Sequence, residues 1–310
     1  MKIFEKIAID PKSFTSIETF YLIMGQINLN NGLILVQFPK NWARRVLDHL
    51  SKEFSLDGIK RTQVVSMLHQ IKKVKTGKNY YPDKEWSVNI NEIISNYNID
   101  KFITRDASTI NTDKSFICST NELAEMGFFS FFNVENGIIN LKNSPDELLK
   151  PAKPLLEMTS QAVFIDPYFA IYNGNETKYS KTLVEFAKFA DKHNKCKMFI
   201  ICTSNKKPTK NPEVNLEKYF YNLLSFLPQG FSIRVMCLEN IKGSSFKVHA
   251  RFFLTDGAGI KYDKGFGSEK DPDYTDVTRI SEKNSNDLYD QYITNVSQCY
   301  EIIYDYTWER

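Results

Sequence analysis

Residues 162–202 read AVFIDPYFAIYNGNETKYSKTLVEFAKFADKHNKCKMFIIC. The stretch begins with an apolar run that ends at Asp166, continues through a segment of helical periodicity at about 178–193, and closes with a second apolar run at 197–202. A strand, a helix and a strand in this order are typical of a parallel sheet with a crossover helix. The stretch therefore predicts an α/β fold.

The same alternation extends in both directions along the chain. Further predicted strands lie at 6–10, 33–37, 101–104, 116–118, 232–237, 247–255 and 259–265. Further predicted helices begin near 13 and 41 or cover about 60–75, 121–126, 213–227 and 284–304. We therefore expect the α/β class for the whole chain, with a predominantly parallel sheet and crossover helices.

A short polar stretch near the middle of the chain is rich in proline. Pro145, Pro151 and Pro154 lie within eleven residues, 144–154, and each removes a backbone donor. We interpret the stretch as a boundary between two domains, residues 1–153 and residues 154–310.

The composition is that of a soluble globular protein. The chain has 310 residues, of which 42% are hydrophobic and 25% charged, with a formal net charge of +3. No apolar run approaches the roughly 18 residues of a membrane-spanning helix, and Glu5 lies where the apolar core of a signal peptide would begin. Five cysteines without CxxC spacing predict reduced core thiols. We therefore expect a cytoplasmic protein without a membrane span.

Positive charge is concentrated in three intervals. Residues 58–82 contain six Lys and Arg and no acidic residue, residues 195–212 contain five, and residues 240–255 contain Lys242, Lys247 and Arg251. Such intervals suit phosphate-bearing partners, because each neutralised phosphate releases counterions. For the first two intervals a solvated helix face or loop is the simpler interpretation.

The third interval carries the strongest candidate for chemistry. Residues 247–256 read KVHARFFLTD, and their alternation predicts a strand with His249 and Arg251 on one face. An imidazole can act as nucleophile or base on a phosphodiester, while a guanidinium bonds two phosphate oxygens. Asp256 at the end of the strand, or a neighbouring carboxylate, would hold the imidazole tautomer. These three residues are the predicted catalytic set.

Two further segments follow predicted strands, where open parallel sheets place ligands. Asp166 and Tyr168 follow the first strand of the C-terminal half, and Ser204 and Lys206 follow the next. Together with Lys247 they are predicted substrate-binding residues. The alternative is a strand-ending turn at Asp166 and a plain polar loop at Ser204.

The pattern of a histidine, a basic residue two positions on and an aspartate five further resembles the HxKxxxxD signature of the phospholipase D superfamily, with Arg251 in place of lysine. The sequence is more similar to the phospholipase D-like domain at the C-terminus of MIT-domain proteins. The matching residues are Asp166-Pro167-Tyr168, His249-x-Arg251, Asp256 and Gly265-Phe266. The resemblance covers about residues 155–310 and implies a mixed sheet with flanking helices there, beside an N-terminal α/β domain of uncertain type.

For an active enzyme, the resemblance implies a phosphodiesterase or nuclease that works through a phosphohistidine, without metal or cofactor. Because the chain has one motif copy, a complete site would need a homodimer that pairs two His249 side chains. The implied substrate is nucleic acid, with an antiviral defence role by association. The MIT-type domains that share the arginine are binding modules, so the same resemblance supports a non-catalytic phosphate-, lipid- or protein-binding module. The asparagine of the downstream Gly-Ser-x-Asn element is missing here.

The N-terminal half carries acidic residues that are similar in kind to those of metal-dependent PIN-type ribonucleases. These are Asp10, Glu18, Asp106 and Asp113. Clustered carboxylates would hold magnesium or manganese, although exposed loop carboxylates are commoner. We expect this half to recognise a protein partner or nucleic acid, with residues 60–78 as the candidate surface. No phosphate loop, HExxH, GxSxG or Rossmann glycine pattern is present.

Overall fold

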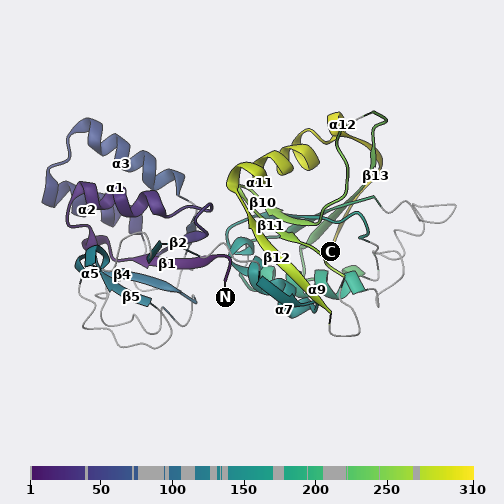
Figure 1. Ribbon diagram of the computed structural model, residues 1–310, viewed down its shortest axis with the longest axis horizontal. Helices are drawn as coiled ribbons and strands as arrows, with labels where there is room; N and C mark the ends of the chain where they lie inside the picture. Colours follow the sequence, from purple (N-terminus) through teal and green to yellow (C-terminus); the bar gives the residue numbers. More distant parts are fainter. Residues whose placement is uncertain are drawn as a thin grey trace. The chain divides into compact units, whose positions relative to one another are not determined.

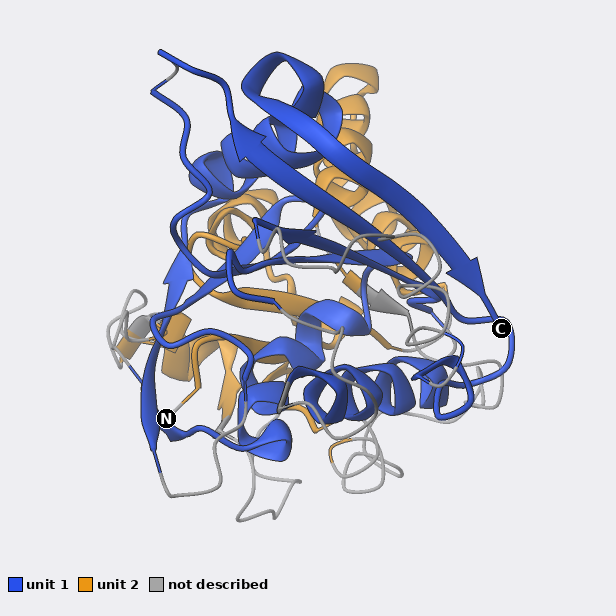
Figure 2. Cartoon of the chain, turned by 90° about the vertical axis from the view of Figure 1, so that its right-hand side faces the viewer, with its two compact units in different colours: residues 1, 136–310 blue, residues 2–135 orange. Residues whose placement is uncertain are grey.

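The computed structural model describes residues 2–38, 41–71, 73–75, 94, 98–105, 116–125, 131–132, 134, 139–169, 178–193, 195–204, 221, 223–243, 245–267 and 273–310. The chain divides into two compact units, which Figure 2 colours blue and orange. Unit 1 comprises Asn136–Arg310 with Met1, and unit 2 comprises Lys2–Glu135. Each unit contains one sheet together with helices, so the predicted α/β class is confirmed.

Unit 2 is built on a parallel sheet in the order β3-β2-β1-β4-β5. The strands are β1 Glu5–Ile9, β2 Leu33–Gln37, β3 Lys73–Lys75, β4 Lys101–Thr104 and β5 Phe116–Ser119. β2 and β3 are added on one side of β1, and β4 and β5 on the other side, so the strand order reverses between β1 and β4 as in doubly wound folds. The strands predicted at 6–10, 33–37, 101–104 and 116–118 are confirmed to within a residue.

Helices of unit 2 pack on the sheet through apolar stripes. They are α1 Ile17–Gln26, α2 Trp42–Phe54, α3 Gly58–Gln70 and α5 Thr120–Glu125, with a 3-10 turn at Pro11–Ser13. Ile7 and Ile9 of β1 lie in one cluster with residues of α1, α2 and α3, whereas Ala8 lies in a second cluster with Val36 and Phe102. Both faces of β1 are therefore buried, which explains its continuous apolar sequence.

Unit 1 is built on a mixed sheet in the order β13-β9-β8-β7-β10-β11-β12-β6. The strands are β6 Ile139–Lys142, β7 Gln161–Ile165, β8 Met198–Thr203, β9 Ser232–Asn240, β10 Phe252–Thr255, β11 Ala258–Tyr262, β12 Tyr274–Ile280 and β13 Tyr300–Glu309. β7, β8 and β9 are parallel, and every other pairing is antiparallel.

Helices cover both faces of the unit 1 sheet (Figure 1). They are α7 Pro145–Leu149, α8 Lys153–Leu156, α9 Lys178–Lys192, α11 Glu282–Tyr289 and α12 Val296–Cys299. On the α9 face, the fully buried ring of Phe164 packs edge-on against Phe186 at 5.3 Å and Phe253 at 5.2 Å. On the α11 and α12 face, Val163 and Ile165 share a cluster with Tyr292. β7 is thus the centre of the core.

The division between the units differs from the predicted boundary at 153. It falls between Glu135 and Asn136, because β6 pairs with β12 in the unit 1 sheet and α7 packs on α9. The prolines begin helices rather than separate domains. Pro145 is the first residue of α7 and Pro154 lies in the first turn of α8, where a missing N–H costs nothing.

Two predictions for the C-terminal half are wrong. The predicted helix at 284–304 ends early, because α11, a π-helical turn at Asp290–Thr294 and α12 stop at Cys299 and β13 follows. The predicted strand 247–255 begins only at Phe252. Phe252 pairs with Ile165, the last residue of β7, and the chain then turns at Pro167, which has no N–H. The residues before Phe252 therefore have no partner for the ladder on this side. The helix predicted at about 213–227 lies largely outside the described residues.

None of the described helices combines the length and the apolar character needed to cross a membrane.

Candidate functional site

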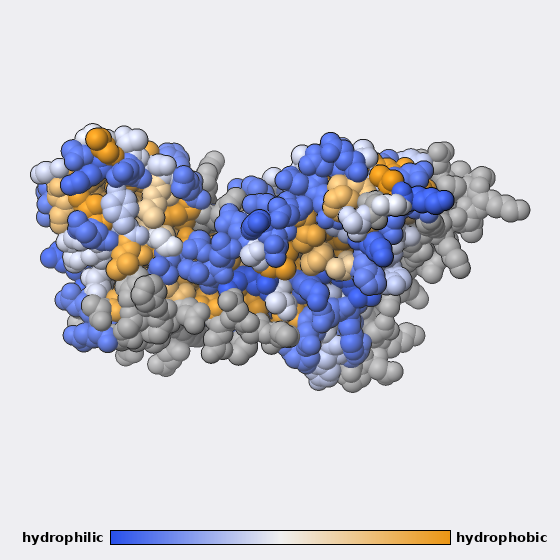
Figure 3. Space-filling view, turned by 45° about the horizontal axis from the view of Figure 1, so that its top comes forward, coloured by the Kyte–Doolittle hydropathy of each residue, from blue (hydrophilic) through white to orange (hydrophobic). Residues whose placement is uncertain are grey.

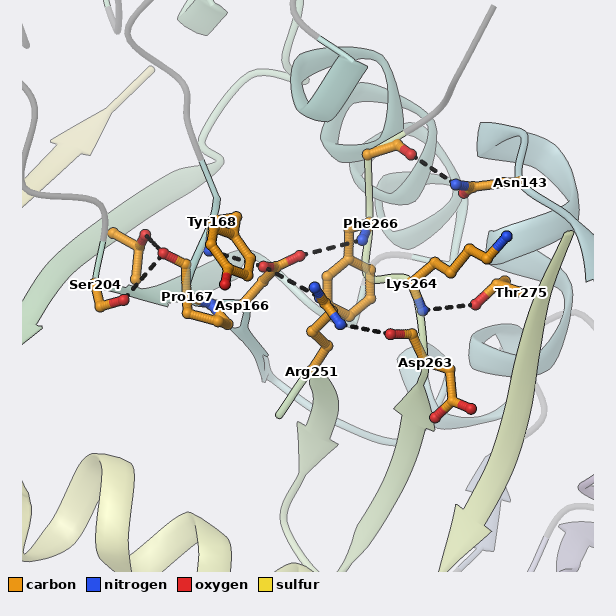
Figure 4. A network of polar contacts seen from close by, with 12 residues as sticks. Asn143, Asp166, Pro167, Tyr168, Ser204, Arg251, Asp263, Lys264, Phe266 and Thr275 are labelled. Carbon is orange, nitrogen blue, oxygen red and sulfur yellow. Dashed lines mark hydrogen bonds and ion pairs between the residues drawn. The ribbon is translucent and has the colours of Figure 1, made fainter. Parts of the chain in front are cut away.

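Asp166 occupies the carboxyl end of β7 and is fully buried, with no exposed side-chain surface. One of its carboxylate oxygens, Oδ1, accepts the backbone N–H of Tyr168 at 2.9 Å, and the other, Oδ2, accepts that of Phe266 at 3.3 Å. The carboxylate thus holds two separate chain segments together (Figure 4). A buried carboxylate also needs a nearby positive charge, because the low-dielectric interior disfavours an isolated ion.

Arg251 supplies that charge. Its Nε lies 3.8 Å from Asp166 Oδ1, and its Nη1 donates to the carbonyl oxygen of Asp263 at 2.5 Å. The guanidinium carbon also lies 5.3 Å from the centroid of the Tyr168 ring, which is within cation–π range. Arg251 is therefore held between a buried carboxylate and an exposed aromatic ring. Its Nη2 makes no hydrogen bond to any residue that the structure describes.

Gly265 allows this arrangement to close. Its φ is +80°, in the left-handed region that residues with a Cβ rarely adopt. A Cβ at this position would collide with Oδ2 of Asp166 and would lie 2.6 Å from Cδ of Arg251. The backbone at 265 consequently passes so close to the ion pair that only glycine fits.

His249 does not lie on a strand, contrary to the prediction. It is exposed in the irregular segment that precedes β10, and Lys247 in the same segment is exposed as well. The Cα of His249 lies within about 7 Å of the Cα of Arg251, because two residues of extended chain reach no further. The strand alternation that was predicted to place both side chains on one face therefore does not apply. Among the described residues, no hydrogen bond or ion pair holds the imidazole of His249 beside the guanidinium of Arg251.

Asp256 is separated from Arg251 by the length of β10. It is exposed in the turn between β10 and β11, so the four residues of the strand place it about 13 Å from the ion pair. Asp256 instead lies near Tyr289: burial raises the pKa of that phenol, the hydrogen bond to Gln161 lowers it, and the charge of Asp256 raises it further. The hydroxyl of Tyr289 bonds the side chain of Gln161, the first residue of β7, whereas Asp166 follows the last. The structure does not bring Asp256 to the site.

Of the other predicted ligand residues, Ser204 lies beside the cluster. Its hydroxyl and its backbone N–H both donate to the carbonyl oxygen of Pro167, at 3.1 and 3.2 Å. Ser204 therefore fixes the turn after β7. Lys206 lies outside the described residues.

Two contributors to the site were missed in the sequence. The carbonyl of Asp263 is a backbone group and leaves no sequence signal. Asn143, directly after β6, is buried and donates through Nδ2 to the carbonyl oxygen of Gly267 at 2.9 Å, while its Oδ1 has no hydrogen-bond partner among the residues that the structure describes. Asn143 thereby holds the segment that contains Gly265. The asparagine lies far away in the sequence, so motif spacing gives no indication of it.

The proposed acidic set of unit 2 does not form a cluster among the described residues. Burial raises the pKa of Asp10, which accepts the N–H of Lys12 at 2.9 Å. Glu18 is exposed, and hydrogen bonds to its own backbone and to Ser16 lower its pKa. Asp106 and Asp113 lie outside the described residues. No group of metal-ligating side chains is found in the described part of the chain.

Comparisons with known proteins give little to set beside this geometry. No family model and no curated protein matches the chain. One solved structure that is similar is that of TrmBL2, an archaeal chromatin protein with a novel mode of DNA binding. The similarity covers 83% of this chain and 87% of that chain at 10% identity, with a TM-score of 0.28. A TM-score this low does not indicate a shared fold, and we infer nothing from it.

Proposed function

We propose that unit 1 is a non-catalytic module that binds nucleic acid at the surface formed by Tyr168, Arg251 and the exposed segment that contains Lys247 and His249. The observation that carries the proposal is the position of Arg251, between the buried carboxylate of Asp166 and the exposed ring of Tyr168. This position stiffens an aromatic ring at the surface, at the rim of a sheet, where ligands of open sheets bind.

Tyr168 provides the contact for a base. Its side chain is 58% exposed although the residue lies next to one of the most buried groups of the unit. Aromatic side chains stack on bases of any identity, and an arginine against the ring adds a cation–π contribution. An exposed tyrosine held by a guanidinium is therefore a suitable stacking platform.

Positive charge near the platform provides the contact for phosphate. Lys247 and His249 are exposed, and Nη2 of Arg251 has no hydrogen bond within the described part of the chain. Because Asp166 compensates much of the charge of Arg251, the long-range attraction for phosphate falls mainly to Lys247. The same compensation argues against Arg251 as the cation that stabilises a developing phosphorane, since much of its charge is already offset by Asp166.

The test is equilibrium binding of a fluorescent single-stranded oligonucleotide to the full chain. Tyr168→Ala should weaken binding by about 5- to 100-fold, the usual effect of removing one stacked ring, and Tyr168→Phe should retain it. Tyr274→Ala is the matched control, because Tyr274 is 52% exposed on β12 and belongs to no part of the site. Equal effects of Tyr168→Ala and Tyr274→Ala, or no salt-sensitive binding at all, would refute the proposal.

A second candidate function is metal-independent phosphodiester cleavage by a homodimer that acts as an antiviral defence effector. It is favoured by the exposure of His249 two residues from Arg251. Cleavage of labelled DNA or RNA in the presence of EDTA, lost in His249→Ala but not in Lys242→Ala, would support this function. Binding without turnover under the same conditions would exclude it and leave the binding module.

A further inference from the structure

Helix α3 of unit 2 presents most of its surface to solvent. Nine of its thirteen residues are exposed, and only Val64 and Leu68 are buried in the core below. The helix is nevertheless anchored, because both buried residues belong to the main cluster of the unit. It is thus a fixed element whose outer surface lacks an obvious packing role.

The exposed side chains of α3 are polar apart from Ile59, which is 75% exposed in the first turn. We call the polar ones the α3 face; they are Lys60, Arg61, Thr62, Gln63, Ser66, His69 and Gln70. All of them can donate hydrogen bonds, and the thirteen residues of α3 include no acidic side chain. The surrounding segment, residues 42–75, contains eight Lys and Arg against three Asp and Glu, whereas the whole chain has a net charge of only +3. The face therefore has a positive local potential.

Contacts within the unit compensate this charge only in part, through the exposed carboxylates of Asp57 and Glu18, which both interact electrostatically with Lys60. Lys60 Nζ lies 4.0 Å from Asp57, with both side chains more than half exposed, and Arg61 Nη1 donates to the neutral hydroxyl of Ser51 at 3.2 Å. Exposed ion pairs of this kind contribute little to stability, so the cation can readily pair with another anion instead. Both cations are therefore available to a ligand. A face that served only for solubility would be expected to mix acidic and basic residues at helical spacing.

The shape of the element suits a groove. An α-helix with its side chains is about 10–12 Å wide, which matches the roughly 12 Å major groove of B-form DNA. α2 and α3 are joined by the three residues Ser55–Asp57, a linker length found in helix-turn-helix pairs. In such pairs the second helix enters the groove and the first crosses the backbone. α2 would be the helix that crosses the DNA backbone, and its Arg44 and Lys52 are exposed.

We propose that the α3 face binds the major groove of duplex DNA, with Lys60 and Arg61 on phosphates and the glutamine, serine and histidine side chains on base edges. This site is in unit 2 and does not depend on the surface around Tyr168. Figure 3 shows one side of the molecule, on which hydrophilic and hydrophobic residues are interspersed. Duplex RNA is a poor alternative, because its major groove is too deep and narrow for side chains to read.

The experiment measures binding of the full chain to labelled duplex DNA of about 20 base pairs, to duplex RNA and to single-stranded DNA of the same sequence, over a range of salt concentrations. Lys60→Ala/Arg61→Ala should weaken duplex DNA binding at least about 10-fold and lower the slope of log affinity against log salt by about 1.8, since each lost phosphate contact contributes about 0.9. Single-strand binding should stay unchanged.

Lys181→Ala/Lys188→Ala is the matched control, because it removes two exposed lysines from a helix, α9, in the other unit. Circular dichroism confirms that each variant is folded. An equal loss in the control, equal affinity for duplex RNA, or an unchanged salt slope in Lys60→Ala/Arg61→Ala would each overturn the proposal. Tyr168→Ala separates the two sites: if it alone affects single strands, the unit 1 proposal holds independently of the outcome for α3.

Discussion

Replacement of Arg251 by methionine should destabilise unit 1 by about 3 kcal/mol. Methionine is shorter than arginine but keeps most of its apolar stem, whereas Asp166 loses the only cation that the described residues place on it. Removing one partner of a buried ion pair typically costs 3–5 kcal/mol, because an uncompensated charge stays buried. We expect the lower end of that range, since the carboxylate retains the backbone N–H groups of Tyr168 and Phe266.

The matched control is Arg234→Met. Arg234 forms two hydrogen bonds to Asp305, with Nε to Oδ1 at 2.8 Å, but both side chains are about one-third exposed. Loss of this pair should therefore cost no more than about 1 kcal/mol. The contrast between two arginine–aspartate pairs isolates the effect of burial.

The assay is urea unfolding with hydrogen exchange of β7 and β10 as the readout, because these strands report on unit 1 alone. If the free energy of unfolding falls by about 2 kcal/mol per molar urea, Arg251→Met should lower the urea midpoint by about 1.5 M. Asp166→Asn in the same background should recover part of the loss, since a neutral amide needs no counter-charge. Equal midpoints for Arg251→Met and Arg234→Met would refute the view that Arg251 neutralises a buried charge.

Two further predictions concern buried groups elsewhere in the chain. Burial raises the pKa of Asp10 above its ordinary value of 3.8, so the folded state favours the protonated acid and loses stability as the pH rises from about that value through the raised pKa. Asp10→Asn should therefore raise the melting temperature at neutral pH and flatten its pH dependence, which thermal scans from pH 3 to pH 8 would check; a lower melting temperature at pH 7 would contradict this. All five cysteines are buried, and burial raises the pKa of Cys196 to about 12 and that of Cys118 to about 11. An aromatic disulfide reagent at pH 8 should label the native protein slowly and all five thiols in denaturant, whereas a rapid native phase would show an accessible thiolate.

Much of the fold could be predicted because its strands are buried on both faces. The run at 162–166 is almost entirely apolar and forms β7 between two helical layers, so its composition alone indicates a strand. β13 was missed although residues 300–309, YEIIYDYTWE, are rich in aromatic and β-branched residues. The helical pattern of the preceding residues continues up to Cys299, and only pairing with β9 decides where the helix ends.

The site could be predicted only in part. Asp166 and Tyr168 could be named because strand-ending Asp-Pro sequences have local causes, and the structure places both against Arg251. The positions of His249 and Asp256 depend on the length of β10, whose start is set by the end of the neighbouring strand β7 and the turn at Pro167 that follows it. No local pattern contains that information.

The shortness of β10 has a consequence for recognising relatives of this chain. Arg251 and Asp256 stand at opposite rims of the sheet, so a search for their spacing detects a strand of four residues and the turns at its two ends. Proteins found in this way would share this short strand and its turns, whether or not they contain the ion pair of Asp166 and Arg251. A search that required an Asp-Pro after one strand, an arginine before the antiparallel neighbour and a glycine in the left-handed conformation where Gly265 lies would select for the ion pair itself.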